Sequence, residues 1–67
     1  MPKIYIAWEH VDYGDSDILS VNESFAGAEG TVLAAIDASQ CQVFRKSNTF
    51  WRGNSGSWLI ESMELEP

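Results

Sequence analysis

Basic residues are scarce in this 67-residue chain, which has four Lys and Arg against ten Asp and Glu and a formal net charge of −6. Between Ile4 and Phe44 there is no Lys or Arg at all. The acids of that stretch are Glu9, Asp12, Asp15, Asp17, Glu23, Glu29 and Asp37. A field of one sign repels nucleic acid and anionic membranes and attracts basic protein surfaces. The composition therefore argues against direct binding to nucleic acid or membranes and indicates a basic protein partner.

Cysteine and histidine each occur once, as Cys41 and His10. A single cysteine excludes an internal disulfide, and one Cys with one His cannot form a structural zinc site. One unpaired thiol is typical of reducing compartments, and the residues after Met1 carry no signal-peptide pattern. No apolar run approaches the about 20 residues of a membrane span. We therefore expect a cytoplasmic protein with no cofactor.

The chain is short enough that residues 1–67 are expected to form a single domain. A domain of this size buries only about 60% of its unfolded surface, so its stability depends on an aromatic-rich core, on a partner subunit or on both. Three Trp, three Phe and two Tyr supply such a core, because each ring buries about 150–250 Å². A homodimer is the other expected source of stability.

Apolar and turn-forming residues follow each other in an order that predicts strands and one helix. The predicted elements are strands at 3–11 and about 17–22, a helix from a Ser24 cap to Ala38 or Ser39, strands at 41–46 and 49–52, a loop at 53–56 and a strand at 58–65. This order, ββα and then two or three strands, predicts an α+β fold in which one helix packs on one face of an antiparallel sheet.

The faces of these elements follow from the spacing of their residues. The predicted pairs of faces are Ile4, Ile6, Trp8 and His10 against Tyr5, Ala7, Glu9 and Val11; Cys41, Val43 and Arg45 against Gln42, Phe44 and Lys46; and Trp58 and Ile60 against Leu59, Met63 and Leu65. The apolar stripe of the helix consists of Phe25, Ala28, Val32 and Ile36. Gly27 and Gly30 each cost about 1 kcal/mol of helix stability relative to Ala. We interpret these two glycines as a sign that the helix packs closely on the sheet.

Three segments carry a resemblance to known proteins: Lys3–Trp8, Ile18–Ser24 and Trp58–Glu66. A first strand with Tyr and Trp, a second strand ending in a Ser cap before an Ala-rich helix, and an acidic last strand resemble a family of small phage and bacterial ββαβ proteins. That family has no settled function. In size, acidity and compactness the chain also resembles phage-encoded anti-CRISPR proteins, which implies inhibition of a host defence complex in the host cell cytoplasm.

Three carboxylates, Asp12, Asp15 and Asp17, are expected at the tip of the first hairpin. Their spacing does not match a calcium-binding EF-hand loop, which needs acids at positions 1, 3 and 5 and a Gly at position 6. A solvated turn is the simpler interpretation. In a third interpretation the acids stand in for phosphates and occupy the Lys and Arg positions of a nucleic-acid-binding protein. The charge asymmetry favours this third interpretation over a metal site.

Catalysis is not expected, although His10 could act as a base and Cys41 or a serine as a nucleophile. Such a pair needs a third group that orients the base and a pocket that excludes water. A histidine packed in or beside the sheet and a small buried cysteine are the simpler interpretations. The acids Glu61, Glu64 and Glu66 could work as an acid–base pair only within a cleft. We therefore expect a protein that is not an enzyme.

One basic and aromatic segment spans residues 45–52 and contains Arg45, Lys46, Phe50, Trp51 and Arg52. Such a segment can stack single-stranded nucleic acid, which the net charge opposes. Its bases could instead neutralise Glu61 and Glu64 across the final hairpin. Its Arg and Trp could also contribute to a dimer contact. We expect at least one of Phe50 and Trp51 in the core.

These observations favour a small acidic inhibitor of phage type that binds a basic, nucleic-acid-binding surface of a host defence complex and blocks nucleic-acid engagement. The residues predicted to bind the partner are Glu9, Asp12, Tyr13, Asp15, Asp17 and Glu29. The alternative is a self-associating accessory domain whose acidity serves only solubility. In that case a sheet edge or a surface with Trp51 and Trp58 would form the homodimer.

Overall fold

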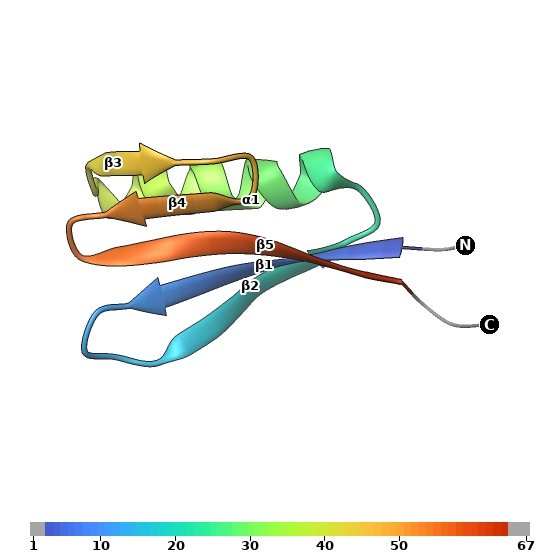
Figure 1. Cartoon of the computed structure of the whole chain (residues 1–67), viewed down its shortest axis with the longest axis horizontal. Helices are drawn as coiled ribbons and strands as arrows, with labels where there is room; N and C mark the ends of the chain where they lie inside the picture. The colour runs from blue at the N-terminus through green and yellow to red at the C-terminus, as the bar shows by residue number, and fades with distance from the viewer. Residues whose placement is uncertain (1–2, 65–67) are drawn as a thin grey trace.

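The computed structural model describes residues 3–64 as a five-stranded antiparallel sheet with one helix against it (Figure 1). The elements are β1 (Lys3–Val11), β2 (Ser16–Asn22), α1 (Phe25–Ser39), β3 (Val43–Lys46), β4 (Phe50–Gly53) and β5 (Gly56–Glu64). The strands lie in the order β2-β1-β5-β4-β3, so the last strand occupies the centre of the sheet. The predicted α+β fold class is confirmed.

The β1–β2 hairpin turns at residues 12–15, as the Asp and Gly residues there predicted. The Gly14 amide donates to the Val11 carbonyl at 2.9 Å, and Tyr13 has a φ of 62°, in the left-handed region. Asp17 was predicted at the tip but lies within β2, opposite Glu9. The acids of this hairpin therefore begin at the turn and continue into the second strand.

Helix α1 begins and ends where the sequence predicted. Ser24 caps it, because its hydroxyl accepts from the Gly27 amide at 3.1 Å. Gln40 ends it in the left-handed conformation, with a φ of 57°. The interpretation of the two glycines is wrong for Gly30, since a Cβ there would have no neighbour within 4 Å. At Gly27 the close neighbours are Asn22 and Ser24 of the capping segment.

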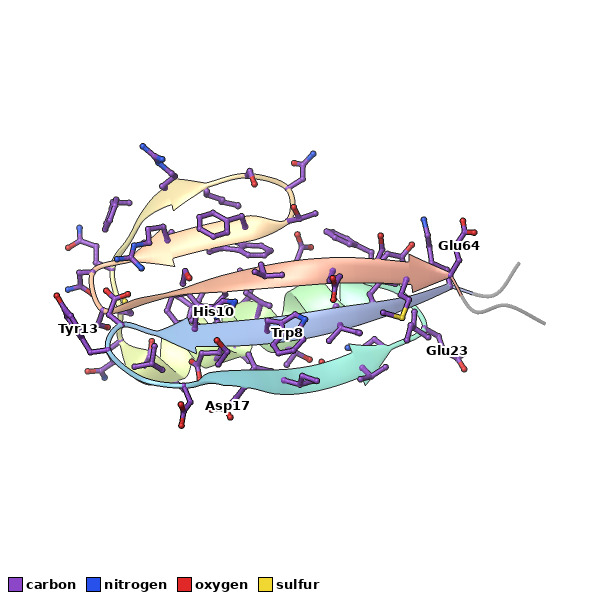
Figure 2. All side chains as sticks on the ribbon, turned by 60° about the horizontal axis from the view of Figure 1, so that its bottom comes forward. Trp8, His10, Tyr13, Asp17, Glu23 and Glu64 are labelled. Atoms are coloured by element: carbon purple, nitrogen blue, oxygen red, sulfur yellow. The ribbon has the colours of Figure 1, made fainter. Side chains whose placement is uncertain are left out.

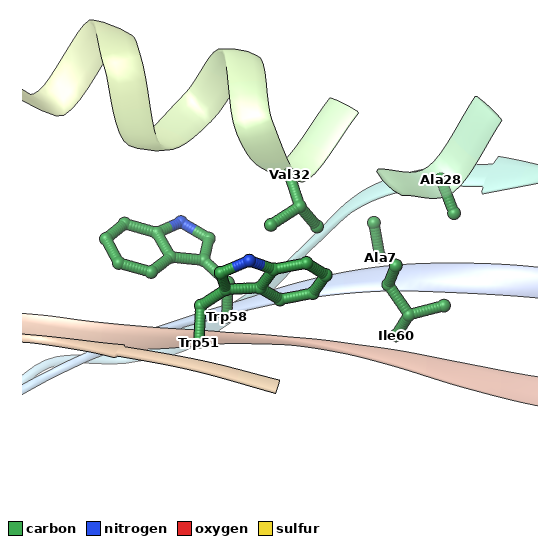
Figure 3. Close-up of a cluster of buried hydrophobic side chains, with 6 residues drawn as sticks. All are labelled: Ala7, Ala28, Val32, Trp51, Trp58 and Ile60. Carbon is green, nitrogen blue, oxygen red and sulfur yellow. The ribbon is translucent and has the colours of Figure 1, made fainter. Parts of the chain in front are cut away.

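The core lies between α1 and one face of the sheet (Figure 3). It consists of Ala7, Ala28, Val32, Trp51, Trp58 and Ile60. Trp51 and Trp58 are partners across the β4–β5 ladder, and their side chains are 2% and 3% exposed beneath α1. The prediction that at least one of Phe50 and Trp51 lies in the core is thus confirmed, by Trp51. The predicted dimer surface made of these two indoles is wrong, because the helix covers them.

Strand β3 begins at Val43 rather than residue 41, and its predicted alternation is wrong. Its ladder with β4 is irregular between Val43 and Arg45, which pair with Gly53 and Arg52. Adjacent residues of β4 face opposite sides of the sheet, so this irregularity places Val43 against the core and turns Arg45 away from it. The predicted loop at 53–56 is shorter, because only residues 54–55 separate β4 from β5. Leu65 lies outside the described residues.

The sheet has a second face, opposite α1, which we call the open face. Its strand residues are Ile4, Ile6, Trp8, His10, Ser16, Ile18, Val21, Arg45, Phe50, Arg52, Ser57, Leu59, Glu61 and Met63. Ile18, Val21 and Met63 are 53%, 56% and 47% exposed. A contiguous exposed apolar patch on a small protein is a feature of interaction surfaces.

No helix in the described part of the chain is long and apolar enough to cross a membrane.

Candidate partner-binding surfaces

The first candidate surface is the β1–β2 turn with the start of β2, where Tyr13, Asp15 and Asp17 are exposed. Figure 2 shows Tyr13 at the tip of the turn and Asp17 in the half of the molecule nearer to the turn, with Glu23 and Glu64 at the other end. The turn is held against the β4–β5 connection, because the Asp12 amide donates to the Ser55 carbonyl at 3.1 Å. This anchoring gives the exposed residues of the turn a defined position.

Asp12 forms a bidentate ion pair with Arg52. Both guanidinium nitrogens lie 2.9 Å from the two carboxylate oxygens, and each side chain is 35% exposed. Hydrogen bonding to Arg52 lowers the pKa of Asp12, and the same contact raises the pKa of Arg52. Neutralisation of an acid, one of the interpretations of the basic segment, thus holds for Arg52, but the acid is Asp12 rather than Glu61 or Glu64. Asp12 belongs to the turn, but its charge is already matched within the chain.

Glu9 is also engaged within the chain. It lies on the helix-facing side of β1, where its Oε2 accepts from the Trp58 indole N–H at 3.0 Å. The N–H of a buried Trp commonly pairs with an acceptor, and the sequence alternation had already placed Glu9 opposite the Ile6 and Trp8 face. Those two facts together are the signal from which this contact could have been expected.

Glu29 is separate from the other predicted residues. It lies in the first half of α1, and α1 starts at the end of the molecule away from the β1–β2 turn and runs back toward it (Figure 1). The structure therefore brings Asp12, Tyr13, Asp15 and Asp17 together at one end, with Glu9 beside them in β1. It does not bring Glu29 to them.

The second candidate surface is a hollow on the open face, which we call the β1–β5 hollow. It has a volume of about 230 Å³ and is lined by Trp8, His10, Leu59 and Glu61. The Trp8 indole N–H donates to Glu61 Oε1 at 3.4 Å. The rings of Trp8 and His10 are parallel to within 9°, with centroids 6.3 Å apart. Sequence reasoning placed Trp8 and His10 on one face but did not select either residue for partner binding.

One contact of His10 bears on catalysis. Its Nδ1 is hydrogen-bonded to Ser16 Oγ. A serine nucleophile with a histidine base needs a third group that orients the imidazole. Within residues 3–64 no carboxylate is hydrogen-bonded to His10, and Ser16 is exposed to water. In the same residues no three His, Cys, Asp or Glu side chains are placed to hold a metal ion.

Cys41 is half-buried rather than buried as predicted. Its thiol donates to Asn54 Oδ1 at 2.9 Å and lies 3.5 Å from Ser55 Oγ. Hydrogen bonding with Ser55 lowers the pKa of the thiol. Cys41 also lies against the backbone at Gly53. These contacts connect the end of α1 to the β4–β5 connection.

No protein-family model, no curated protein and no solved structure matches this chain.

Proposed function

We propose that this chain is a small, non-enzymatic inhibitor of phage type that binds a basic, nucleic-acid-binding surface of a host defence complex and keeps nucleic acid away from it. The net charge of −6 supports a basic partner, since opposite charges steer association. In the host cytoplasm such a partner would already be engaged with nucleic acid, so the acids compete with phosphates for the same Lys and Arg side chains.

The observation that carries the proposal is the conformation of Tyr13. Its side chain is fully exposed, and its backbone is left-handed with a φ of 62°. A left-handed non-glycine residue costs about 1–2 kcal/mol, and folding recovers nothing from a ring that touches water on all sides. Such a residue at the tip of an anchored turn is suited to contact a partner, because Tyr is a frequent hot spot at interfaces.

The acids next to Tyr13 supply the charge. Within residues 3–64 neither Asp15 nor Asp17 forms an ion pair or a side-chain hydrogen bond, and both are exposed. Their carboxylates are therefore free to meet Lys and Arg of a partner. Glu9 and Glu29 add to the long-range field, and Glu9 keeps its hydrogen bond inside the chain. Asp12 adds little, because Arg52 balances its charge.

The test is capture of partners from nuclease-treated bacterial lysate at low and high salt, with the Asp15→Asn/Asp17→Asn variant beside the native protein. We expect the native protein to retain a nucleic-acid-binding complex at low salt and to lose it at high salt, because salt screens exposed charges. The double variant should lose the complex at both salt concentrations. Added DNA or RNA should displace the native protein from the complex.

The matched control is Glu23→Gln/Glu64→Gln. This variant also removes two negative charges, but at the opposite end of the molecule (Figure 2). If capture depends on the turn, this control keeps the complex. Equal loss in both double variants would show that net charge alone is responsible, and the assignment to the turn would be wrong. No salt-sensitive complex with the native protein would contradict the proposal as a whole.

A second candidate function is self-association through the open face. The exposed apolar residues Ile18, Val21 and Met63 favour it, because interface cores are apolar and depleted of charge. Among the described strand residues of the open face, Glu61 is the only acid. Light scattering at several protein concentrations measures the molecular mass and separates the two functions. A stable homodimer that becomes a monomer in Val21→Lys would support self-association through the open face.

A further inference from the structure

The β1–β5 hollow has a composition that selects one kind of ligand. It is lined by the aromatic rings of Trp8 and His10, by Leu59 and by one carboxylate, Glu61. Its volume of about 230 Å³ is below the about 300–1,000 Å³ of pockets for small-molecule ligands. A hollow of this size takes a single side chain of a partner.

Figure 2 shows Trp8 and His10 on the near side of β1, with α1 behind the sheet. Their two rings, parallel to within 9°, offer aromatic faces, and aromatic faces attract cations. Glu61 is exposed, and only its Oε1 has a partner among the described residues, the distant Trp8 N–H at 3.4 Å. Its Oε2 remains available to a donor.

We propose that the β1–β5 hollow binds an arginine side chain of the basic partner. The guanidinium stacks on the Trp8 indole and donates to Glu61, while Leu59 contacts the aliphatic part of the side chain. Arginine fits better than lysine, because its planar guanidinium stacks on aromatic rings and pairs with a carboxylate through two N–H groups. Lysine carries a compact ammonium that is more strongly hydrated and does not stack.

Charge and position both favour a basic partner over a second copy as the occupant. A second copy brings its own net charge of −6 toward the same charge, whereas a basic surface brings the opposite sign. Of the chain's two arginines, Arg52 is already paired with Asp12. The hollow also lies near the acidic turn, since His10 is the penultimate residue of β1 and Asp12 follows the end of that strand. The identity of the partner rests on the proposed function, but the arginine preference of the hollow does not.

The experiment uses two capped peptides, one of alternating Gly and Arg and one in which Lys replaces every Arg, titrated into the ¹⁵N-labelled native protein. The readout is the indole N–H resonance of Trp8. Trp51 and Trp58 are 2% and 3% exposed, so their indole resonances serve as internal references. We expect the Arg peptide to shift the Trp8 resonance and to bind at least about threefold more tightly than the Lys peptide.

Two substitutions assign the binding to the hollow. Glu61→Gln should weaken Arg-peptide binding at least about fivefold, while Glu64→Gln should have a much smaller effect. Glu64 is the matched control, because it lies on the same strand but pairs with Lys3 on the other face of the sheet. Trp8→Leu should remove the preference for Arg over Lys. Equal weakening by Glu61→Gln and Glu64→Gln would mean general attraction by the net charge, which would overturn the inference.

The outcomes also separate this inference from the proposed function. If the Arg peptide binds the hollow but no nucleic-acid-binding complex is captured from lysate, the inference stands and the proposed function fails. If Asp15→Asn/Asp17→Asn abolishes capture while the Arg peptide leaves the Trp8 resonance unmoved, the proposed function stands and the inference fails. A Trp8 resonance that responds to protein concentration and not to either peptide would show that a second copy covers the open face, which also overturns the inference.

Discussion

The Glu9 carboxylate and the Trp58 indole N–H form a hydrogen bond of 3.0 Å between partner residues of the central strands β1 and β5. Trp58 is 3% exposed, so water cannot replace this acceptor. Glu9 therefore contributes a hydrogen bond to the core in addition to its negative charge. Any variant at this position changes both the field of the molecule and the packing of its core.

We expect Glu9→Leu to lower the free energy of unfolding by about 1–3 kcal/mol, because it leaves the buried Trp58 N–H without an acceptor. Glu9→Gln keeps an amide oxygen at the same place and should cost less than about 1.5 kcal/mol, although it removes the same charge. Urea unfolding followed by tryptophan fluorescence measures both values. Equal losses in the two variants would mean that charge, and not the hydrogen bond, is what matters at Glu9.

The ion pair between Asp12 and Arg52 makes part of the stability depend on pH. Arg52 lowers the folded-state pKa of Asp12, so the pair stabilises the fold at pH values above the unfolded-state pKa of about 3.9. This contribution is lost as the pH falls through the lowered pKa. We expect the difference in unfolding free energy between the native protein and Asp12→Asn to be largest above about pH 5 and to shrink toward pH 2.

The control for that experiment is Asp17→Asn, since the Asp17 side chain has no ion pair in the described chain. Its stability difference from the native protein should change less with pH. Molar salt should also reduce the Asp12→Asn difference, because the pair is partly exposed and screened. An Asp12→Asn difference that stays constant from pH 7 to pH 2 would contradict a role for the ion pair.

Local patterns were enough to predict most elements of this fold. The alternation of Ile4, Ile6 and Trp8 predicted which face of β1 is turned away from the helix, and Ser24 predicted the start of α1. These predictions succeed because side-chain direction and helix capping depend on neighbours within a few positions. The irregularity between Val43 and Arg45 has no such local signal, and it reversed the predicted side of Arg45.

The acidic turn could be predicted because its residues are close in sequence, whereas the Asp12–Arg52 ion pair and the β1–β5 hollow join residues far apart in the chain and were not predicted. Arg52 and Asp12 are 40 positions apart, and Trp8 and Glu61 are 53 positions apart. The Trp8–Glu61 contact requires β1 beside β5, and the Asp12–Arg52 contact also requires β4 on the other side of β5. Strand order is set by the packing of the whole sheet, so a pattern within one strand does not contain it.

Two glycines should respond in opposite ways to alanine. A Cβ at Gly56 would lie 2.6 Å from the His10 carbonyl oxygen, which is backbone of the neighbouring strand and cannot move without breaking the ladder. Gly56→Ala should therefore destabilise the protein by about 2 kcal/mol or more. Gly30→Ala meets nothing within 4 Å and should stabilise α1 by about 1 kcal/mol.

Thermal unfolding followed by circular dichroism measures the two glycine variants side by side. We expect the melting temperature to fall for Gly56→Ala and to rise for Gly30→Ala. A neutral Gly56→Ala would show that the β4–β5 connection can shift away from β1. A destabilising Gly30→Ala would mean that this exposed position of the helix has a neighbour that the described chain does not show.

Tyr13 should show a conflict between stability and binding. Its left-handed backbone is unfavourable for Tyr and better suited to Asn, and its exposed ring makes no compensating contact. We therefore expect Tyr13→Asn to raise the free energy of unfolding by about 0.5–1 kcal/mol and to weaken capture of the partner.

The matched control for Tyr13 is Gln40→Gly, because Gln40 also has a left-handed backbone, with a φ of 57°, at the end of α1. This variant should gain a similar about 0.5–1 kcal/mol without any change in capture. Urea unfolding and the lysate capture assay are run on both variants. If Tyr13→Asn is more stable and still retains the complex, the ring is not an anchor, and the partner is held by the carboxylates of Asp15 and Asp17 alone. If Tyr13→Asn is stable and loses the complex while Gln40→Gly keeps it, the strain at the turn is maintained for binding.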